Sequence, residues 1–342
     1  MSKKAVGLIH NVPVSPNQAF AAASADVLTQ ISSIEEALGA LGYQSVRIPF
    51  TKEVNGFIAK MKEEGVEIAV NLCETVDEDP RFAGHPAALL ELMDISFSGS
   101  PAMALMLTTD KALTKQLLRA HGIRTPAYLM YDGETDFDFQ ALKFPVILKP
   151  RFQDASIGIE QESIFLDDIS FREGINGFLD RFGPLLAEEY IDGREFNVSV
   201  FGYPLPKALP LAEIDFSALP KGFFPIVGYR AKWDTSSFEY YHIPRKFPQS
   251  LSSSLRQEIE KTALECFSLL MLRDYGRIDI RVHDDGQIYV LEVNANPCLS
   301  PDAGLAAAAQ QAGMSYTDIV ETLMGFVEER NRNDGTSTCH TR

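Results

Sequence analysis

A regular β-hairpin near the C-terminus limits the possible folds of this chain more than any other feature of its sequence. Residues 275–304 read YGRIDIRVHDDGQIYVLEVNANPCLSPDAG. The first run alternates charged and β-branched residues, as a half-buried strand does, and the second run is mostly apolar. Asp285-Gly286, between the two runs, is a dipeptide favoured in two-residue type I′ turns. The segment therefore predicts two antiparallel strands joined by a tight turn.

This turn determines which residues of the two strands face each other. A two-residue turn pairs Asp284 with Gln287, and counting back along both strands places Asp279 opposite Glu292. Like charges directly opposite each other destabilise a sheet. We therefore expect a positive charge between these two carboxylates.

Two interpretations of this charged end of the hairpin are open. The same register places Arg277 opposite Asn294, so carboxylate and amide oxygens gather at one place, which suits Mg²⁺ bound together with substrate phosphates. Alternatively, Arg277 and Arg281 neutralise the two carboxylates in a surface ion-pair cluster. The polar, proline-ended turn at 294–297, directly after a buried strand, favours a functional site.

Composition excludes several classes of protein. With 342 residues, 45% hydrophobic and 23% charged, the chain predicts a globular protein of two or three domains. A net charge of −16 argues against nucleic-acid or anionic-membrane partners, and an acidic protein that handles phosphates needs local cations. No stretch has the length of a membrane span or of a signal peptide, so we expect a cytoplasmic protein. Four widely spaced cysteines predict neither a disulfide framework nor a metal site (Cys73, Cys266, Cys298 and Cys339).

Strand and helix patterns alternate over the first part of the chain. Apolar runs predict strands at 5–9, 43–50, 66–74 and 95–100, and helical periodicity predicts helices at about 25–41, 53–64 and 85–93. Such alternation predicts an α/β domain with a parallel sheet over residues 1–105.

The remaining chain changes in style. A helix is expected at 108–123, short strands from 125 to 216, a loop rich in Pro, Gly and aromatic residues at 217–248, and helices at 250–272 and 315–329. We therefore expect two α+β portions, residues 106–194 and 195–329, the second with the metal site. A polar tail, 330–342, is expected to be flexible.

Three lysines stand in contexts that suit phosphate binding. Lys111 opens a helix, Lys149 ends the apolar strand FPVILKP, and Lys232 lies in the aromatic segment YRAKW. The small-residue turn at 154–158 could cradle phosphate with its backbone N–H groups, although it contains a single glycine. The alternative for Lys149 is an ordinary residue at the edge of a sheet.

Other polar residues carry weaker signals by themselves. Glu188, Glu189 and Glu195 flank a strand and turn and could accept hydrogen bonds from an adenine or a ribose, but most such glutamates are merely solvated. Cys298 has no partner histidine nearby in the sequence, which favours a structural thiol over a nucleophile. Trp233, the single tryptophan, could pack or bind.

Taken together, these segments resemble the ATP-grasp superfamily, and within it the D-alanine–D-alanine ligase group. The resemblance covers most of the chain and is strongest at SGSPAMALMLTTDKALTKQLLRAHGIRTP, FPVILKP, EEYIDGREFNVSVFG and GRIDIR…GQIYVLEVNANP. The order and spacing of these segments agree with the family, which is far more specific than any one motif. The resemblance implies an ATP-grasp fold, with two α+β subdomains that clamp ATP after the N-terminal α/β domain.

The resemblance also implies roles for particular residues. ATP phosphates would be contacted by Lys111, Lys149 and Lys232, and covered by the 154–158 loop with Ser156. The adenine and ribose would be held by Glu188, Glu189, Ile191 and Glu195. Two Mg²⁺ ions, replaceable by Mn²⁺, would be bound by Asp279, Glu292 and Asn294. Arg277 and Lys232 would act at the reaction centre, beneath an aromatic lid at 229–233. The amino-acid substrates would lie near Trp233, Asn296, Cys298, Ala303 and Gly304.

The chain departs from the family where amino acids are bound. The family's first loop carries a glutamate, which HNVPVSPNQAF lacks, and its His-Gly after the third strand is replaced by NLCET. Ala155-Ser156 replaces a serine pair, and Trp233 matches the lid tyrosine. Cys298 and Ala303-Gly304 stand where the family has a glycine and then a Ser-Leu pair that meets the second substrate. The resemblance therefore implies a carboxylate–amine ligase whose substrates need not be D-alanine.

Two other functions remain open from the sequence. One is an authentic, divergent D-alanine–D-alanine ligase, and the other is an ATP-binding regulatory or scaffold protein without catalysis. We expect small-molecule substrates and no nucleic-acid or membrane partner. A homodimer is left open. Residues 11–20, 71–76, Trp233 and 298–304 are expected to line one pocket beside the γ-phosphate.

Overall fold

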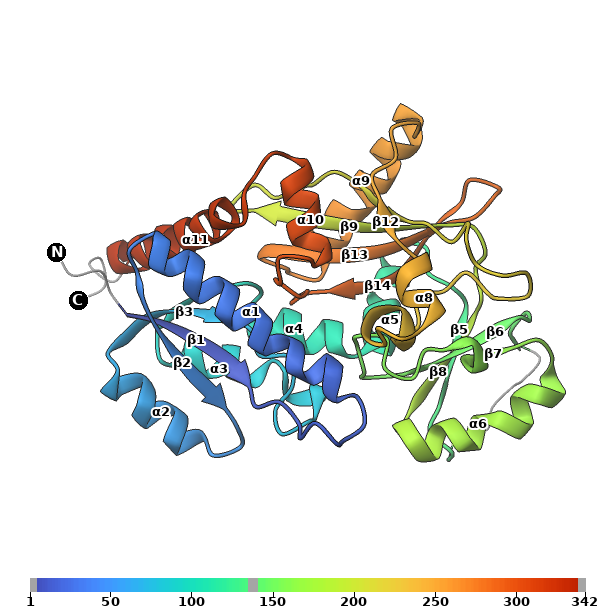
Figure 1. Ribbon diagram of the computed structural model, residues 1–342, viewed down its shortest axis with the longest axis horizontal. Coiled ribbons are helices and arrows are strands. Elements are labelled where there is room, and N and C mark those ends of the chain that lie inside the picture. The colour runs from blue at the N-terminus through green and yellow to red at the C-terminus, as the bar shows by residue number, and fades with distance from the viewer. Residues whose placement is uncertain (1–4, 135–140, 338–342) are drawn as a thin grey trace.

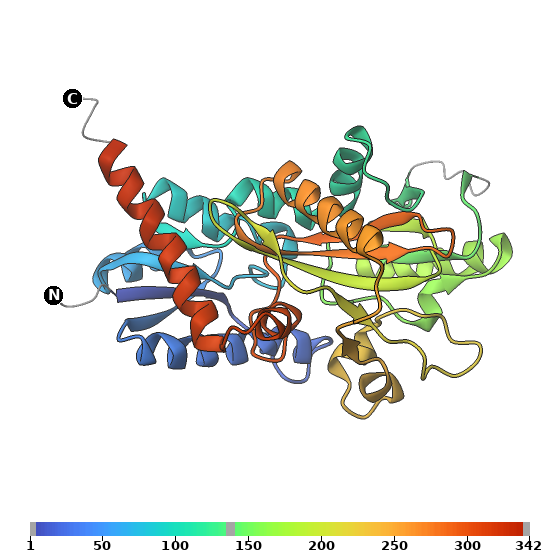
Figure 2. The ribbon, with the colours of Figure 1, turned by 90° about the horizontal axis from the view of Figure 1, so that it is seen from above.

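The computed structural model describes residues 5–134 and 141–337, which form three β-sheets with helices packed around them (Figure 1). The sheet at the N-terminus and the central sheet lie at opposite ends of the molecule, and the C-terminal sheet lies between them (Figures 1 and 2). This arrangement confirms the expected combination of a parallel α/β part with antiparallel α+β parts. None of the helices in the described residues combines the length and the apolar character that a bilayer crossing requires.

The first sheet has four parallel strands in the order β2-β1-β3-β4. The strands are β1 (Ala5–Asn11), β2 (Gln44–Phe50), β3 (Val66–Asn71) and β4 (Ser96–Ser98), and the helices around them are α1 (Ala21–Ala40), α2 (Val54–Glu63), the short η1 (Pro80–Phe82) and α3 (His85–Leu92). Because the carboxyl ends of parallel strands meet at one edge, the loops after β1 and β3 are neighbours. The backbone N–H of Glu74 accordingly lies 3.4 Å from the Oδ1 atom of Asn11.

The central sheet is antiparallel, in the order β5-β8-β6-β7. Its strands are β5 (Tyr128–Tyr131), β6 (Val146–Pro150), β7 (Ile164–Phe165) and β8 (Leu185–Glu189), and helix α6 (Asp168–Phe182) packs on it. The short η3 (Gln161–Ser163) lies beside β6, and helices α4 (Ala102–Thr109) and α5 (Lys111–Ala120) precede the sheet in the chain. The sequence predicted one helix at 108–123, but the chain breaks at Asp110, whose carboxylate caps α5 by accepting from the N–H groups of Ala112 and Leu113. Lys111 is thereby fixed at the start of α5.

The C-terminal sheet follows the order β12-β11-β9-β13-β14, with β10 paired to β9. Its strands are β9 (Arg194–Gly202), β10 (Lys207–Ala208), β11 (Ala212–Ile214), β12 (Arg245–Lys246), β13 (Asp274–Val282) and β14 (Ile288–Asn294). The helices in this part of the chain are α7 (Tyr229–Trp233), α8 (Phe238–His242), α9 (Ser253–Leu269), α10 (Gly304–Gln311) and α11 (Tyr316–Ser337). The expected loop at 217–248 therefore contains two short helices and an edge strand. The last helix extends beyond its expected end at 329, to Ser337, and residues 338–342 lie outside the described residues.

The hairpin of β13 and β14 has the predicted facing residues but not the predicted turn. Asp279 pairs with Glu292, and Arg277 pairs with Asn294. Near the turn, however, Val282 pairs with Ile288, one residue out of the predicted register. The turn is one residue longer than a two-residue turn, and a bulge at Leu291 restores the register before Glu292 is reached. The prediction of a two-residue type I′ turn was wrong, and the bulge compensates for the difference.

Two side chains outside the hairpin stabilise the bulge by donating hydrogen bonds to its carbonyl groups. The Nζ atom of Lys115 on α5 donates to the Leu291 carbonyl at 3.0 Å, and the Thr125 hydroxyl donates to the neighbouring carbonyl of Val290 at 2.8 Å. A bulge leaves backbone groups unpaired within the ladder, so these two side chains satisfy them. The segment before the central sheet therefore holds the part of the hairpin that carries Glu292.

Apolar side chains form one core in the central sheet and two cores that join the ends of the chain. The central core lies within residues 142–187. In contrast, Ile319 and Leu323 of α11 pack in one cluster with Leu8 of β1 and Ile34 of α1, so the chain returns to the first sheet, as Figure 2 shows. The boundaries expected at 105, 194 and 329 stay predictions, since the first and last units share cores.

Candidate active site

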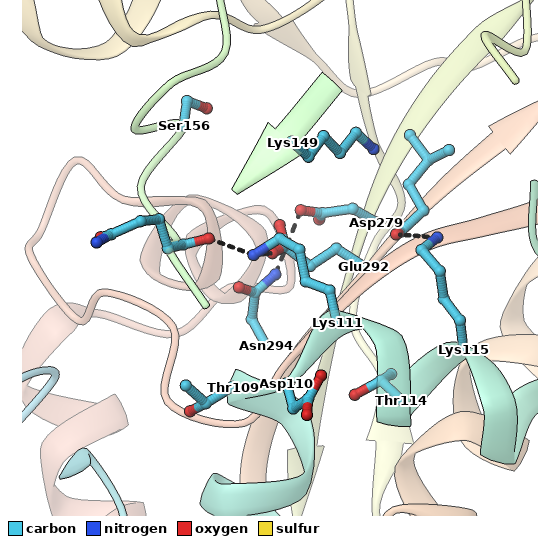
Figure 3. A network of polar contacts seen from close by, with 12 residues as sticks. Thr109, Asp110, Lys111, Thr114, Lys115, Lys149, Ser156, Asp279, Glu292 and Asn294 are labelled. Carbon is cyan, nitrogen blue, oxygen red and sulfur yellow. Dashed lines mark hydrogen bonds and ion pairs between the residues drawn. The ribbon is translucent and has the colours of Figure 1, made fainter. Parts of the chain in front are cut away.

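Four hairpin residues form the centre of the candidate site, shown in part in Figure 3. Arg277 donates to both carboxylate oxygens of Asp279, from Nε at 2.8 Å and from Nη2 at 2.9 Å. The side-chain amides of Asn197 and Asn294 donate to the same carboxylate at 2.8 and 3.3 Å. A positive charge does lie beside each facing carboxylate, because Glu292 pairs with Lys111 at 2.7 Å. Arg281 pairs with Glu195 and with neither of these carboxylates, so the alternative in which Arg277 and Arg281 together neutralise Asp279 and Glu292 is wrong.

Lys111 reaches Glu292 because two segments hold the start of α5. Arg151, directly after β6, donates from Nε and Nη2 to the Asp110 cap at 2.8 and 2.6 Å, and its carbonyl accepts from the Lys111 N–H. The Lys111 side chain also donates to the Gln153 carbonyl. Burial alone would raise the pKa of Glu292, but the charge of Lys111 and its hydrogen bond lower this pKa to about 2. Glu292 is therefore ionised at neutral pH.

Glu188, expected beside the nucleotide, is fully buried at the centre of a lysine pair. Its carboxylate lies 3.2 Å from the Nζ atom of Lys115 and 2.8 Å from that of Lys149. Burial would raise the pKa of Glu188, and the two ammonium groups lower it below its usual value. Lys115 was missed by the sequence analysis because its partner, Glu188, comes from a distant strand. Strand β7 pairs with β6 only at Val146 and Ile147, so Lys149 has a strand neighbour on one side alone, Leu186 of β8, and the alternative given for it stays open.

The 154–158 loop and the expected lid are in contact. The Ser156 hydroxyl donates to the Val227 carbonyl at 2.8 Å, and the Trp233 Nε1 atom donates to the Ala155 carbonyl at 2.9 Å. Ala155 and Ser156 both have positive φ angles, 50° and 61°, so this loop makes a tight turn beneath α7. Phe20, in the loop after β1, packs edge-on against Tyr229 of α7 with ring centroids 5.0 Å apart.

The third phosphate lysine, Lys232, lies on α7 and faces the same centre. Burial lowers its pKa, as does the charge of Arg277, while Asp279 and Glu292 act in the opposite direction. Lys111, Lys149 and Lys232 all contribute to the low pKa of Glu292. Of the three lysines, Lys111 contacts Glu292 directly, whereas Lys149 pairs with Glu188 and acts on Glu292 through its charge, as Lys232 does.

Two of the remaining residues expected around adenine and ribose, Ile191 and Glu195, are tied together by Arg281. This arginine donates to the Glu195 carboxylate, with N and O 2.5 Å apart, and to the carbonyl of Ile191 at 3.0 Å. It also donates to the Pro225 carbonyl at 2.7 Å. Glu189 lies at the end of β8 and accepts from the Lys143 N–H at 2.9 Å. Glu195 and Ile191 are thus fixed near one another by Arg281, a partner that the sequence analysis placed elsewhere, whereas Glu189 is held by the backbone of Lys143.

The residues expected around the substrates have different surroundings. Asn296 accepts from the Tyr275 hydroxyl at 3.0 Å and donates to the Cys73 carbonyl at 3.3 Å, so it joins the hairpin to the loop after β3. The Cys298 thiol lies 2.9 Å from the Oδ2 atom of Asp26. Burial, followed by the charge of Asp26, raises the pKa of Cys298, which supports a structural thiol. Ala303 and Gly304 begin α10.

A pocket opens beside Glu292. Its lining includes Lys111, Asp154, Asn294, Asn296, Cys73 and Glu74. Four parts of the chain were predicted to line one pocket. Of these, only segment 71–76 lines this one, through Cys73 and Glu74, and Trp233 and segments 11–20 and 298–304 do not. Trp233 lies instead over the 154–158 loop.

Glu74 and Asp26 are polar residues of this region that the sequence analysis did not single out. The Nε2 atom of Gln30 donates to both carboxylates at 3.1 Å, and Gln30 is itself buried. Glu74 faces the pocket and so keeps some exposed surface, while protein encloses it elsewhere. Burial, then the negative charges of Asp154 and Asp26, raises the pKa of Glu74 to about 8. The segment NLCET gave no indication of the raised pKa of Glu74, because the neighbouring charges come from other segments.

The raised pKa of Glu74 predicts a pH-dependent stability. The ordinary pKa of a glutamate is 4.5, so as pH rises from about 4.5 to about 8 the unfolded chain ionises Glu74 while the folded chain resists ionisation. The free energy of unfolding therefore falls as pH rises across this range. Glu74→Gln removes the loss, and we expect the melting temperature of the variant to rise relative to wild type between pH 5 and 8.5. Glu78→Gln, an exposed change in the same loop, is the control. A difference that stays constant with pH would show that Glu74 ionises normally.

The donors at the hairpin fit a magnesium ion chemically. Two carboxylates and an amide supply only oxygen atoms, which Mg²⁺ prefers, and substrate phosphates usually complete its coordination. Asn294 donates its amide nitrogen to Asp279, so its Oδ1 atom remains for another partner. Within residues 5–134 and 141–337, no group of three or more His, Cys, Asp or Glu side chains could hold a metal by itself. A metal here would thus depend on Asn294 and on the substrate.

The fold and this arrangement of lysines and carboxylates define an ATP-grasp enzyme. A family model described as "D-ala D-ala ligase C-terminus" matches residues 117–325. The D-alanine–D-alanine ligase of Carboxydothermus hydrogenoformans is 31% identical over 302 residues, 85% of this chain and 90% of that protein. Uncharacterized protein y4sG of Sinorhizobium fredii is 30% identical over 267 residues, 78% of this chain and 76% of that protein. The chain therefore belongs to the D-alanine–D-alanine ligase family.

A solved structure agrees with this fold. The D-alanine–D-alanine ligase of Bacillus anthracis, crystallised as a complex with ATP, superposes with a TM-score of 0.77 at 22% identity, over 97% of this chain and 99% of that one. Both the expected family and the expected ATP-grasp fold are confirmed. The family consists of ATP-dependent ligases that form a C–N bond, so the expected class of enzyme is confirmed as well.

Proposed function

We propose that this protein joins a carboxylate to an amine through an acyl phosphate, with release of ADP and phosphate. The observation that carries the proposal is the pairing of each facing carboxylate with a cation, Glu292 with Lys111 at 2.7 Å and Asp279 with Arg277 at 2.8 Å. The charges of Lys149 and Lys232 also help to keep the pKa of Glu292 low. A triphosphate carries several negative charges, and a site that neutralises them needs cations from more than one direction. Both members of the facing carboxylate pair already lie within this group of cations.

In the proposed reaction, an oxygen of the substrate carboxylate attacks the γ-phosphorus, and the bond between that phosphorus and the bridging oxygen of ADP breaks. The amine of the second substrate then attacks the acyl carbon and loses a proton, and inorganic phosphate leaves. Phosphoryl transfer of this kind needs positioning and charge neutralisation more than covalent help from the protein.

Each charged residue then has a defined task. The three lysines bind phosphate oxygens, and Arg277 stabilises the oxyanion that develops on the acyl carbon. Glu188 holds Lys149 in place, because its fully buried carboxylate contacts the ammonium groups of both Lys149 and Lys115. Ser156 and Trp233 keep the 154–158 loop and α7 together, which excludes water while the acyl phosphate exists.

We also propose that Asp279, Glu292 and Asn294 hold two Mg²⁺ ions, for which Mn²⁺ can substitute. When bound, these ions neutralise phosphate charge and orient the transferred group. Arg277 and Lys111 occupy the same carboxylates without metal, so they would turn toward the substrate when metal binds. Glu189, Ile191 and Glu195 are proposed to face the adenine and ribose. The cytoplasmic location and the homodimer stay predictions.

The substrates need not be D-alanine. The residues that depart from the family lie around the expected substrate region, whereas the lysines, Arg277 and the metal-binding residues are kept. An authentic D-alanine–D-alanine ligase and an inactive ATP-binding protein remain the alternatives. The approach of Arg277 to Asp279 and of Lys111 to Glu292 favours catalysis over the inactive alternative.

Phosphate release with a panel of L- and D-amino acids, singly and in pairs, tests the proposal. D-Alanine alone is expected to support little release, and another carboxylate–amine pair is expected to support much more, because unmatched buried polar groups discriminate strongly. Product masses identify the bond formed. If D-alanyl-D-alanine is the best product, the authentic ligase replaces this proposal. ATP binding without release for any pair supports the inactive alternative.

A further inference from the structure

Lys115 is a buried ammonium group to which the proposed reaction gives no task. It lies on α5, one helical turn after Lys111, and only 2% of its surface is exposed. Its Nζ atom donates to the Thr125 hydroxyl at 2.8 Å and to the Leu291 carbonyl at 3.0 Å, and it lies 3.2 Å from the Glu188 carboxylate. An ammonium has three N–H donors, so Lys115 has one acceptor for each of them.

Lys149 meets the same carboxylate but keeps donors for another partner. Its Nζ atom donates to the second carboxylate oxygen of Glu188 at 2.8 Å, and this is its one hydrogen bond among the described residues. The Lys149 side chain is 15% exposed, whereas the Lys115 side chain is 2% exposed. Of the two lysines beside Glu188, Lys149 alone therefore has donors left for a ligand.

The charges of this cluster do not cancel. Two ammonium groups share one fully buried carboxylate, so one positive charge remains. Burial lowers the pKa of Lys115 to about 8, although Glu188 acts in the opposite direction, so this group is still charged at pH 7. An uncompensated buried charge is unfavourable. The cluster can therefore offer the charge of Lys149 to an anion while Lys115 keeps the Glu188 carboxylate paired.

The same ammonium group also reaches the hairpin that carries Glu292. The Leu291 carbonyl, which accepts from Lys115, belongs to the bulge that restores the register directly before Glu292. Lys111 pairs with Glu292 itself at 2.7 Å, and both lysine side chains extend from α5 toward the hairpin (Figure 3). Lys115 therefore holds the backbone next to the place where the facing carboxylates meet.

We propose that Lys115 is a positioning residue that makes the phosphate lysines and the metal-binding hairpin depend on one buried cation. It acts as the permanent counter-ion of Glu188, which leaves the charge of Lys149 for an ATP phosphate. It also holds the bulge that sets the place of Glu292. This inference rests on the proposed ligase function, but it concerns binding and not the identity of the substrates. Lys115 itself touches neither phosphate nor metal in this role.

Calorimetry of ATP binding in EDTA tests the first task, since no metal then contributes. Lys115→Met leaves Lys149 as the only cation beside Glu188, and we expect the Kd for ATP to rise by about tenfold or more. In the background of Glu188→Gln, the same Lys115→Met change should alter this Kd by less than about threefold, because no buried carboxylate remains to retain Lys149. Equal effects in both backgrounds would overturn the inference, since Lys115 would then act without Glu188.

Binding of Mn²⁺ tests the second task without any turnover. The probe is the electron paramagnetic resonance signal of the free ion, which is lost as Mn²⁺ binds to protein saturated with a non-hydrolysable ATP analogue. Lys115→Met should raise the Kd for Mn²⁺ by about tenfold. An unchanged Kd would overturn the inference, because the bulge would then not set the place of Glu292.

A second variant separates the two tasks. Thr125→Val keeps the shape of the side chain but removes the donor to the Val290 carbonyl, 2.8 Å away, beside the bulge. It should raise the Kd for Mn²⁺ and leave the Kd for ATP in EDTA within about twofold of wild type, because the ion pair of Lys115 with Glu188 remains. A Thr125→Val variant that weakens ATP binding as much as Lys115→Met would overturn the assignment of two separate tasks.

A matched control comes from the next residue of α5. Gln116 is exposed, so Gln116→Met changes the same helix without touching the cluster, and both Kd values should equal those of wild type. Lys115→Arg keeps the charge and should recover part of the loss in ATP affinity. A lower melting temperature of Lys115→Met with both Kd values unchanged would make Lys115 a structural residue and overturn the inference. If no pair in the panel releases phosphate, the proposed ligase function fails, and the two binding measurements still decide the role of Lys115.

Discussion

Glu292→Gln is expected to reduce turnover by about a thousandfold while the protein stays folded. The change keeps the size of the side chain and removes the charge that Lys111 now pairs with at 2.7 Å. If Glu292 holds Mg²⁺, the variant loses a metal ligand whose contribution to the transition state is several kcal/mol, and about 1.4 kcal/mol corresponds to each tenfold in rate. Phosphate release at saturating ATP measures the effect.

Two comparisons make this expectation specific. Asp284→Asn removes an exposed carboxylate from the turn of the same hairpin and should leave turnover unchanged. Asp279→Asn should be less severe than Glu292→Gln, because Glu292 remains to hold one ion, and its residual activity should need more Mg²⁺ for half-saturation. Turnover of Glu292→Gln within a few-fold of wild type would return the facing carboxylates to a purely structural ion-pair cluster.

The same pair responds to pH in a defined direction. The pKa of Glu292 in the folded protein is about 2, against an ordinary glutamate pKa of 4.5. Its ion pair with Lys111 therefore stabilises the fold fully above pH 4.5, and this contribution is lost as pH falls toward 2. The site is already charged and paired at neutral pH, so its electrostatic arrangement precedes the binding of any ligand.

The hairpin shows how far local patterns predict a structure. Alternation and the Asp-Gly turn were enough to place Asp279 opposite Glu292, although the true turn is longer and the chain contains a bulge. The bulge depends on Lys115, which comes from a helix that precedes the central sheet. No pattern within the hairpin indicates that contact, and the two deviations cancel only because both lie on the turn side of Glu292.

Helices without a strong apolar stripe were harder to predict. Helix α6 contains Gly174 and Gly177, which weaken a helical signal, and α10 reads GLAAAAQQ, with polar residues only at its end. Both helices exist because they cover apolar surfaces of sheets and other helices. Family resemblance gave the roles of lysines and carboxylates, whereas Glu74 and Asp26 gain their surroundings from segments that are far apart in the sequence.

Arg330 is the clearest case of a residue whose environment the sequence concealed. It was assigned to a polar tail, yet it is buried in α11 and donates to Asp274 with two hydrogen bonds, at 2.5 and 2.8 Å. It also donates to the Phe97 carbonyl at 2.7 Å. Asp274 is fully buried and accepts from the Gly99 N–H at 2.9 Å. One ion pair therefore joins α11, β13 and the end of β4.

Arg330→Met is expected to lower the free energy of unfolding by about 3–5 kcal/mol, because it leaves the carboxylate of Asp274 buried without its cation. Methionine keeps much of the length of the side chain, so lost packing contributes little. Chemical denaturation measures the change, and Arg332→Met, an exposed arginine two residues later, is the matched control with an expected change within about 0.5 kcal/mol.

A double substitution separates the charge from the packing. Asp274 has a positive φ of 64°, which asparagine also tolerates, and an asparagine oxygen can still accept from Gly99. Adding Asp274→Asn to Arg330→Met should therefore recover part of the lost stability, since no buried charge remains unpaired. If the double variant is less stable than Arg330→Met by the full cost of Asp274→Asn alone, the two residues act independently. The ion pair would then not be what holds the last helix against the first sheet.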